Sequence, residues 1–250
     1  MPNFSISVDT FQITDTRSVH TDTNHGSISF RVVDEFDNEG TSYNFPEYGN
    51  YNNGTYAGNL VCAPLTVNPN IPLTFNYLIL NAGFTNPTSA HSVLQDVGTQ
   101  MVQSSSYPAF ASCLQQVATQ YAATFNTILR PGCDGLVAAE QNTFTFAELL
   151  SRTAGTPATF RQSTTHIGPT IAHSCNPRPS HYIVNWSLSQ VVAVPDVNGM
   201  TGNQAAATLK AVNLLPPTSF GNGYVSSQVP AAGSLAPLRS TVRLSFGGIR

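Results

Sequence analysis

The strongest constraint on the fold is an alternation of apolar and polar residues that recurs through the first 190 residues. Residues 4–8, 28–32 and 182–188 carry it, and the apolar run at 73–80 is a further strong strand. Neighbouring side chains of a strand point to opposite faces, so each segment is expected to place one face on a core. Additional β character is expected at 144–149 and 159–165. The pattern therefore predicts a mainly β fold.

A helical period interrupts the strands in the middle of the chain. Val93, Leu94, Val97 and Met101 recur at helical spacing, and apolar residues between positions 110 and 128 do so again. The second pattern begins after a serine cap with a first-turn proline and stops at a Pro-Gly pair. Helices inserted between strands, at about 89–130, predict that residues 1–190 form a β-sandwich with a helical insertion.

Charged residues make up only 9% of the chain, against roughly 25% in an average soluble domain. Hydrophobic residues make up 41%, enough for a sizeable core. Residues 1–190 hold six Arg and twelve acidic residues, for a net charge of −6, whereas the remainder carries +3. Low surface charge removes one obstacle to association, so it favours a self-associating protein. The sequence contains no basic patch, so a nucleic-acid partner is not predicted.

No apolar run is long enough to span a membrane. The first residues, from Met1 to Ser5, lack the basic and apolar regions of a signal peptide. We expect either that a signal was removed or that export follows another route, so the route is left open.

Four cysteines occur, at positions 62, 113, 133 and 175, without any CxxC pair. A zinc site is therefore not expected. Four cysteines allow three disulfide pairings. Cys133 and Cys175 both lie in loop-like sequence, so a bridge between them is the preferred prediction, and Cys113 is either bonded or a buried thiol.

The last sixty residues contain a recognisable order of motifs. Val194-Pro-Asp-Val-Asn-Gly-Met200 precedes a helical pattern with a capping box formed by Thr201 and Gln204. Gly223-Tyr-Val225, Pro230-Ala-Ala-Gly233 and Ser240-Thr-Val-Arg-Leu244 then follow. This order and spacing resemble a PASTA domain over residues 191–250.

The resemblance implies a small α+β module with one helix on a three-stranded sheet, placed outside the cell or on its surface. It implies binding or spacing rather than chemistry, with peptidoglycan as the partner of the family. Two positions where the family commonly has glycine differ here: Asn213, which tolerates the left-handed conformation that ends a helix, and Arg239. Binding of an anionic stem peptide would need cations, and Arg239 and Arg243 are the candidates.

The first part of the chain has a looser resemblance, carried by the run from Phe11 to Thr23 and by residues 133–139. They resemble an N-terminal domain of uncharacterised bacterial proteins. This resemblance implies no activity and no functional residue.

An aromatic stretch rich in Asn and Gly is the other candidate for ligand binding. Aromatic rings with a polar tip suit sugar or subunit contacts, although such a loop can also fold over its own domain. The candidate residues are Tyr43, Phe45, Tyr48, Tyr51 and Tyr56.

Metal and catalytic signals are sparse. His20, Asp22 and His25 have metal-ligand side chains close in sequence, but a polar hairpin loop is the favoured explanation, so no metal site is predicted. His166, His173 and His181 flank a Pro-rich loop with a spacing that matches no zinc pattern. No Gly-x-Ser-x-Gly elbow, Walker loop, dinucleotide motif or EF-hand occurs, so neither catalysis nor a cofactor is predicted.

Three hypotheses about function follow. The first is a non-enzymatic, extracellular structural protein that assembles with copies of itself into a filament or particle. The alternatives are a protein that binds peptidoglycan or another glycan, and an enzyme anchored to the cell wall. Electron microscopy, retention by purified sacculi and an activity screen separate the three.

Overall fold

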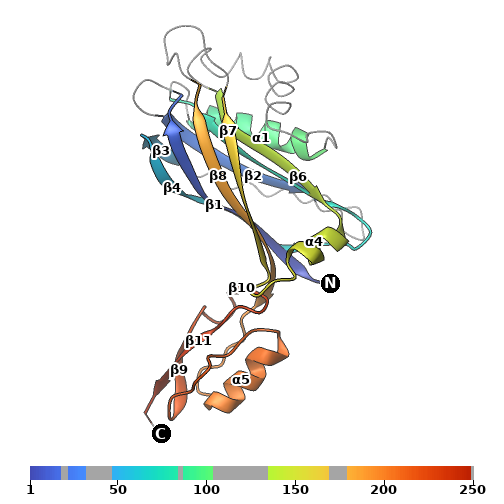
Figure 1. The fold of residues 1–250 in the computed structure, drawn as a ribbon, viewed down its shortest axis with the longest axis vertical. Coiled ribbons are helices and arrows are strands. Elements are labelled where there is room, and N and C mark those ends of the chain that lie inside the picture. The colour runs from blue at the N-terminus through green and yellow to red at the C-terminus, as the bar shows by residue number, and fades with distance from the viewer. Residues whose placement is uncertain (18–21, 32–46, 84–86, 104–134, 169–178, 249–250) are drawn as a thin grey trace.

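The computed structural model describes residues 1–17, 22–31, 47–83, 87–103, 135–168 and 179–248, and these form a larger and a smaller body joined end to end (Figure 1). Within these described residues, the larger body contains two sheets and the helices α1 and α4. The smaller body, residues 194–248, is called the C-terminal module below.

The first sheet of the larger body is built around β8, His181–Ala193. One edge of β8 pairs antiparallel with β1, Asn3–Asp15, which in turn pairs with β4, Gly54–Thr66. The other edge pairs first with β7, Thr159–Ile167, and then, near its end, with β10, Leu235–Pro237. Strand β10 belongs to the C-terminal module. It pairs with the same edge of β8 as β7 does, beyond the end of β7.

The second sheet has four strands in the order β3-β2-β5-β6. The strands are β2, Asp22–Arg31, β3, Glu47–Tyr51, β5, Leu73–Asn81, and β6, Gly135–Phe144. All three pairings in this sheet are antiparallel. Its strong central strand, β5, agrees with the apolar run predicted at 73–80.

The two sheets face each other across one apolar core. Alternate residues of β1 and β8 point into it, and β5 and β6 supply the opposite wall. The largest side chains that are fully buried there include Trp186, Tyr77, Tyr182, Phe4 and Phe75. The mainly β class with additional helices is confirmed, and the larger body is a sandwich, since the period-two pattern places every second residue in this core.

The outer face of the second sheet is covered by α1, Pro87–Gln103, which lies across β2 and β5 (Figure 1). Val93, Leu94 and Val97 of α1 are buried in a second apolar cluster with Leu78 and Leu80 of β5. The helical pattern at 93–101 is thereby confirmed. The second predicted helix, within 104–134, lies outside the described residues.

Helix α1 changes the environment of β2, which the alternation predicts to be half-buried. Ser27 and Ser29 are completely buried on its outer face. The approach is close because Gly98 of α1 has no side chain: a Cβ there would lie 2.5 Å from the Ser29 hydroxyl oxygen. Asn76 of β5 donates a side-chain hydrogen bond of 3.0 Å to the Gly98 carbonyl. A polar residue on a strand can thus face a helix rather than solvent.

The β character predicted at 144–149 is wrong beyond Phe144, where β6 ends. Residues Phe146–Arg152 form helix α4. Thr145 is its N-cap, and a complete capping box joins Thr145 and Glu148. The hydrogen bonds from the Thr145 backbone and side chain lower the pKa of Glu148. The Thr-x-x-Glu motif was present in the sequence and outweighs the β-forming residues around it.

The C-terminal module has helix α5, Gly202–Ala211, beside a sheet formed by β9, Tyr224–Val229, and β11, Arg243–Gly247. The Thr201–Gln204 capping box predicted from the sequence is present. The predicted three-stranded sheet is corrected: β9 and β11 form a two-stranded sheet, and β10 pairs with β8 of the sandwich. Val197, Ala205, Leu209, Leu214 and Val242 form much of the module's own core.

No helix among the described residues is long and apolar enough to cross a membrane.

Candidate ligand grooves on the C-terminal module

The turn before α5 shapes the candidate site. Asp196 accepts hydrogen bonds from the Asn198 backbone and side chain, at 3.0 and 2.9 Å. Gly199 follows with φ +76°, a conformation that glycine adopts readily. The Gly199 amide donates to the Val225 carbonyl, and the Val225 amide donates to the Met200 carbonyl, both at 2.8 Å. The turn is therefore held against β9.

The first groove lies between this turn and the ends of β9 and β11, with a volume of about 570 Å³. It is lined by Gly199, Tyr224, Val225, Ser226, Gly247 and Gly248. Tyr224 is 40% exposed, although it is the first residue of a strand. Glycine makes the groove's geometry feasible: a Cβ on Gly223, at φ +95°, would lie 2.3 Å from the Gly247 carbonyl oxygen.

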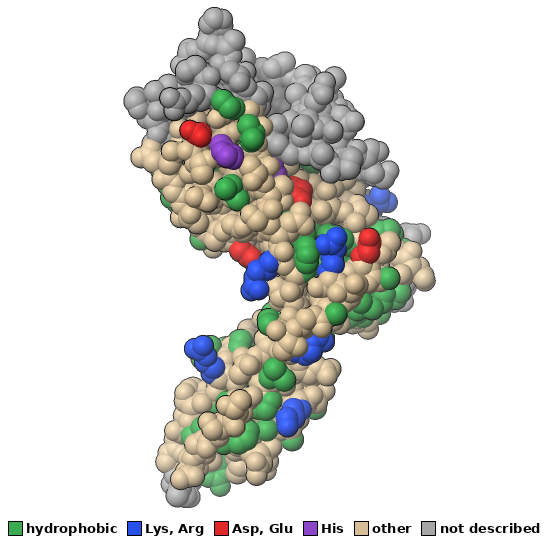
Figure 2. Space-filling model, viewed as in Figure 1, with side chains coloured by type: hydrophobic (Ala, Val, Ile, Leu, Met, Phe, Trp, Pro, Cys, Tyr) green, Lys and Arg blue, Asp and Glu red, His purple; other side chains and the backbone are tan. Residues whose placement is uncertain are grey.

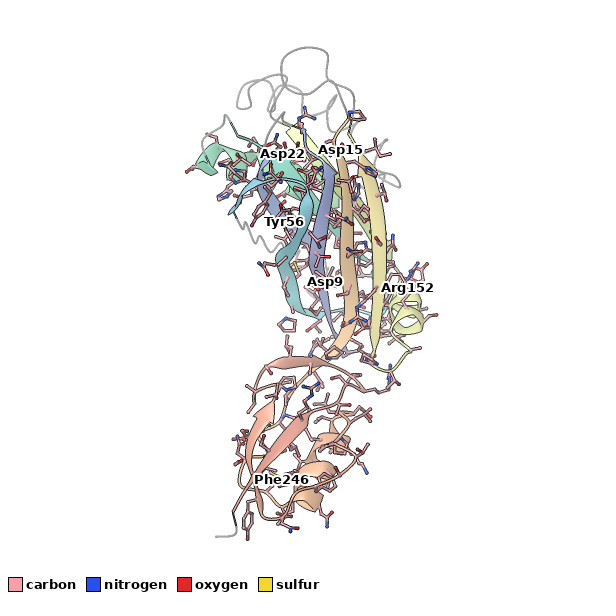
Figure 3. All side chains as sticks on the ribbon, turned by 60° about the vertical axis from the view of Figure 1, so that its left-hand side comes forward. Asp9, Asp15, Asp22, Tyr56, Arg152 and Phe246 are labelled. Atoms are coloured by element: carbon pink, nitrogen blue, oxygen red, sulfur yellow. The ribbon has the colours of Figure 1, made fainter. Side chains whose placement is uncertain are left out.

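A second groove, of about 460 Å³, lies on the other side of the same turn, along α5. Its lining residues are Asn198, Gly199, Met200, Gln204, Ala207 and Thr208. The two grooves therefore meet at Gly199. They occupy the end of the module that is remote from the sandwich, where Phe246 is labelled (Figure 3).

Neither groove has a charged residue among its described lining residues. They offer instead an aromatic ring with a hydroxyl, a thioether and several amides and hydroxyls. Such a surface suits a neutral ligand with its own hydroxyl or amide groups, because ring faces bury apolar area while polar tips form hydrogen bonds.

The two predicted cationic residues lie away from the grooves. Arg243 is exposed on β11, as the alternation predicts, four residues from Gly247 and hence about 13 Å along the strand. Arg239 is turned toward the sandwich, and its guanidinium donates to the carbonyls of Gly155 and Thr153. Their role in ligand binding stays a prediction. Figure 2 shows how few charged side chains lie on one face of the molecule.

The predicted aromatic stretch lies on the sandwich, far from these grooves (Figure 3). Tyr51 of β3 stacks on Tyr56 of β4, with ring centroids 3.9 Å apart, and both rings contact Phe11. Tyr51 and Tyr56 are half-buried and close one margin of the core. Tyr48 belongs to β3, whereas Tyr43 and Phe45 lie outside the described residues.

The candidate metal ligands are separated by the strand geometry. Asp22 and His25 both lie on β2, three residues apart, and therefore face opposite sides of the sheet. Asp22 accepts hydrogen bonds from the Tyr182 hydroxyl, at 2.5 Å, and from the Arg17 amide. His25 packs edge-to-face against His91 of α1. Within the described part of the chain, no group of three or more His, Cys, Asp or Glu could hold a metal, and His20 lies outside it.

The burial of Tyr182 and the nearby Asp22 carboxylate raise the pKa of Tyr182 well above its ordinary value. This phenol therefore stays protonated and donates a hydrogen bond to the Asp22 carboxylate. Among the cysteines, Cys62 is buried in the sandwich core, and the predicted Cys133–Cys175 bridge lies outside the described residues.

A polar network that the sequence patterns do not predict lies inside the sandwich, centred on Glu140 of β6. One carboxylate oxygen accepts from the Tyr77 hydroxyl, at 2.5 Å, and the Trp186 indole, at 3.2 Å. The other accepts from the side-chain amides of Asn142, at 2.9 Å, and Gln162, at 3.2 Å. Four donors from four strands thus bind one carboxylate, and this arrangement is suited to holding strands together. No short motif predicts this network, because Tyr77, Gln162 and Trp186 are distant from Glu140 in sequence.

Comparison with known proteins gives one positive result. No curated protein and no solved structure matches the chain. The family model of the PASTA domain matches residues 192–248, which confirms the resemblance seen in the sequence. The C-terminal module of this chain, with its one helix and its two grooves, is a PASTA domain.

Proposed function

We propose that this chain binds peptidoglycan or a closely related cell-wall glycan through the grooves of its PASTA domain, and that it works at the cell surface. The observation that carries the proposal is the PASTA match over the residues that form both grooves. PASTA domains occur in cell-wall-associated proteins and act in binding rather than catalysis. Nothing in this domain calls for a cofactor.

The chemistry of the grooves supports a sugar ligand over a charged peptide. A glycan of N-acetylated sugars presents hydroxyl and amide groups on one hand and flat apolar ring faces on the other. Tyr224 provides a ring for stacking, and Asn198, Gln204 and Ser226 provide donors and acceptors around it. The described lining residues carry no charge to match an anionic stem peptide.

Replacing Tyr224 with alanine is expected to weaken binding to purified sacculi by at least about tenfold, because truncating a central aromatic contact typically costs more than about 1.4 kcal/mol. The measurement is a sedimentation assay of the intact protein with sacculi at increasing concentration. Tyr224 is exposed, so the fold should survive its removal. Thermal unfolding of the variant checks this.

Two further variants make the assay specific. Ile167 lies on β7 of the sandwich, away from the grooves, and is 59% exposed. The control Ile167→Ala removes a comparable exposed apolar side chain. We expect this variant to bind sacculi as the wild type does. Arg243→Ala tests which part of peptidoglycan is bound, the glycan or the stem peptide. Reduced binding of this variant would indicate that Arg243 contacts the anionic stem peptide. Retention that survives Tyr224→Ala, or no retention of the wild type, would contradict the proposal.

Self-association is a second candidate function, supported by the edge of the first sheet. Among the described strands, β4 is the last in its sheet. Its thirteen residues include no charged side chain, and Val61 is 48% exposed. Uncharged strand edges are templates for pairing with another chain, although Pro64 limits pairing at one end. Electron microscopy of the pure protein at two concentrations tests it: filaments or particles would support a structural subunit, and isolated monomers would exclude it.

Catalysis has little support among the described residues. The Glu140 carboxylate is the strongest candidate for a catalytic group, but it already accepts hydrogen bonds from four donors. We therefore propose that the chain is not an enzyme.

A further inference from the structure

The junction between the sandwich and the PASTA domain consists of backbone pairing rather than a free linker. Strand β10 pairs with the last residues of β8, Leu235 with Ala193 and Pro237 with Val191. Beyond β10, the Leu238 amide donates to the Gln190 carbonyl and the Leu238 carbonyl accepts from the Ala158 amide, both at 2.8 Å. Segments from three parts of the chain therefore meet at Leu238.

The next residue, Arg239, has φ +59°. This left-handed conformation suits glycine and is unfavourable for a residue with a side chain. The Arg239 amide donates to the Asn213 carbonyl, at 2.7 Å, just after α5, so the strained backbone also belongs to the fold of the PASTA domain. A side chain at such a position is unfavourable unless another interaction compensates for the cost of the backbone conformation.

The guanidinium of Arg239 provides that interaction across the junction. Its Nε donates to the Gly155 carbonyl, at 2.8 Å, and one terminal nitrogen donates to the Thr153 carbonyl, at 2.6 Å. Hydrogen bonds from a charged donor are stronger than those between neutral groups, so two of them can offset the cost of the backbone conformation.

The accepting carbonyls are themselves anchored to the sandwich. Thr153 is the C-cap of α4 and is completely buried. Arg152, the last residue of α4, lies between two aromatic rings of the core, 5.0 Å from the centre of Phe144 and 4.5 Å from that of Phe160. Figure 3 shows Arg152 at the end of the sandwich that faces the PASTA domain. Arg239 thus binds a rigid part of the larger body.

We propose that Arg239 is a positioning residue that locks the PASTA domain in one orientation on the sandwich, so that the chain behaves as a single rigid rod. The grooves then point away from the sandwich, and the end of the sandwich marked by Asp15 and Asp22 is held at the opposite extremity (Figure 3). If the proposed wall binding holds, the lock makes the sandwich project from the wall in a defined direction. The orientation itself does not depend on any ligand.

The test compares Arg239→Gly with the wild type in the absence of ligand. Glycine removes the guanidinium but accepts the left-handed backbone, so the PASTA domain should still fold. In the wild type, residual dipolar couplings of the sandwich and the PASTA domain should fit one common alignment tensor. In Arg239→Gly the backbone pairing of β10 with β8 remains, so the couplings of the two bodies should fit one common tensor less closely than in the wild type, and the amides of Ala158 and Leu238 should exchange about 10–100-fold faster.

The matched control is Arg243→Ala, which removes an exposed arginine from the same domain and should retain the common tensor. Unchanged couplings and exchange in Arg239→Gly would overturn the proposal. It would also be overturned if Arg239→Gly unfolded the domain or accelerated exchange equally at Val225 and Val242 in the module core, since Arg239 would then support folding rather than orientation. Because no ligand is present, a failure of wall binding leaves this result unaffected.

Discussion

Replacing Trp186 with alanine is expected to destabilise the sandwich by about 3–5 kcal/mol, the usual cost of removing a large aromatic side chain from a core. Trp186 is completely buried, and Phe75, Phe144 and Phe160 surround it with ring centroids 5.0 to 6.3 Å away. Its indole also donates to Glu140, so truncation leaves both a cavity and a carboxylate with one donor fewer. Urea unfolding followed by circular dichroism measures the loss, because the variant has no tryptophan left to fluoresce.

A second substitution separates these two effects. Trp186→Phe keeps most of the apolar contact and removes the indole donor, so we expect a loss of about 1.5–3 kcal/mol, the cost of one hydrogen bond to a charged group. A loss under about 1 kcal/mol for Trp186→Ala would show that the surrounding rings collapse into the space, and that the inter-sheet core does not depend on this residue.

Acidification from pH 7 to pH 4 is expected to destabilise the sandwich through His166. Its side chain is completely buried, and desolvation lowers its pKa from 6.5 to about 3. The unfolded chain therefore binds a proton below about pH 6.5 that the folded chain does not accept until about pH 3. The stability that His166 contributes is complete above pH 6.5 and falls as the pH drops toward 3, by up to about 1.4 kcal/mol per pH unit.

The groups facing His166 allow a clean control. The Tyr77 hydroxyl of β5 lies 2.8 Å from the His166 Nε2 and also donates to Glu140 of β6. His166→Gln offers Tyr77 a neutral polar partner that does not titrate. The unfolding free energy of this variant, measured at pH 7, 6, 5 and 4, should therefore fall less steeply than that of the wild type. Parallel curves for the two proteins would show that His166 does not carry the acid sensitivity.

Local patterns predicted much of the architecture, because they encode which face of an element is buried. The alternation at 4–8 and 182–188 placed Phe4 and Trp186 correctly on the core face. The capping box at Thr201 and the left-handed Asn213, at φ +58°, could be read directly, since capping depends on residues a few positions apart. The same logic would have found α4 from Thr145 and Glu148, had local β propensity been weighed less.

The candidate site was predicted only in part. The sequence identified the PASTA domain, and with it the region of the grooves, but not the groove residues Tyr224 and Gly199. Those two lie 25 residues apart and are brought together by the backbone bonds between the turn and β9. The aromatic stretch was a reasonable hypothesis from composition, yet Tyr51 and Tyr56 pack on Phe11, because a ring can bury its area against its own domain as readily as against a ligand.

The class of fold, the position of the PASTA domain and the local caps can be predicted from the chain, because they depend on short-range periodicity and on residues near each other. The partners of Glu140, the burial of His166 and the contact of Arg239 with Thr153 and Gly155 become visible in the folded molecule alone. Apart from Asn142, the partners in these contacts are 22 to 89 positions apart in the sequence. Pattern analysis cannot reach such contacts, because the chain must fold before those side chains meet.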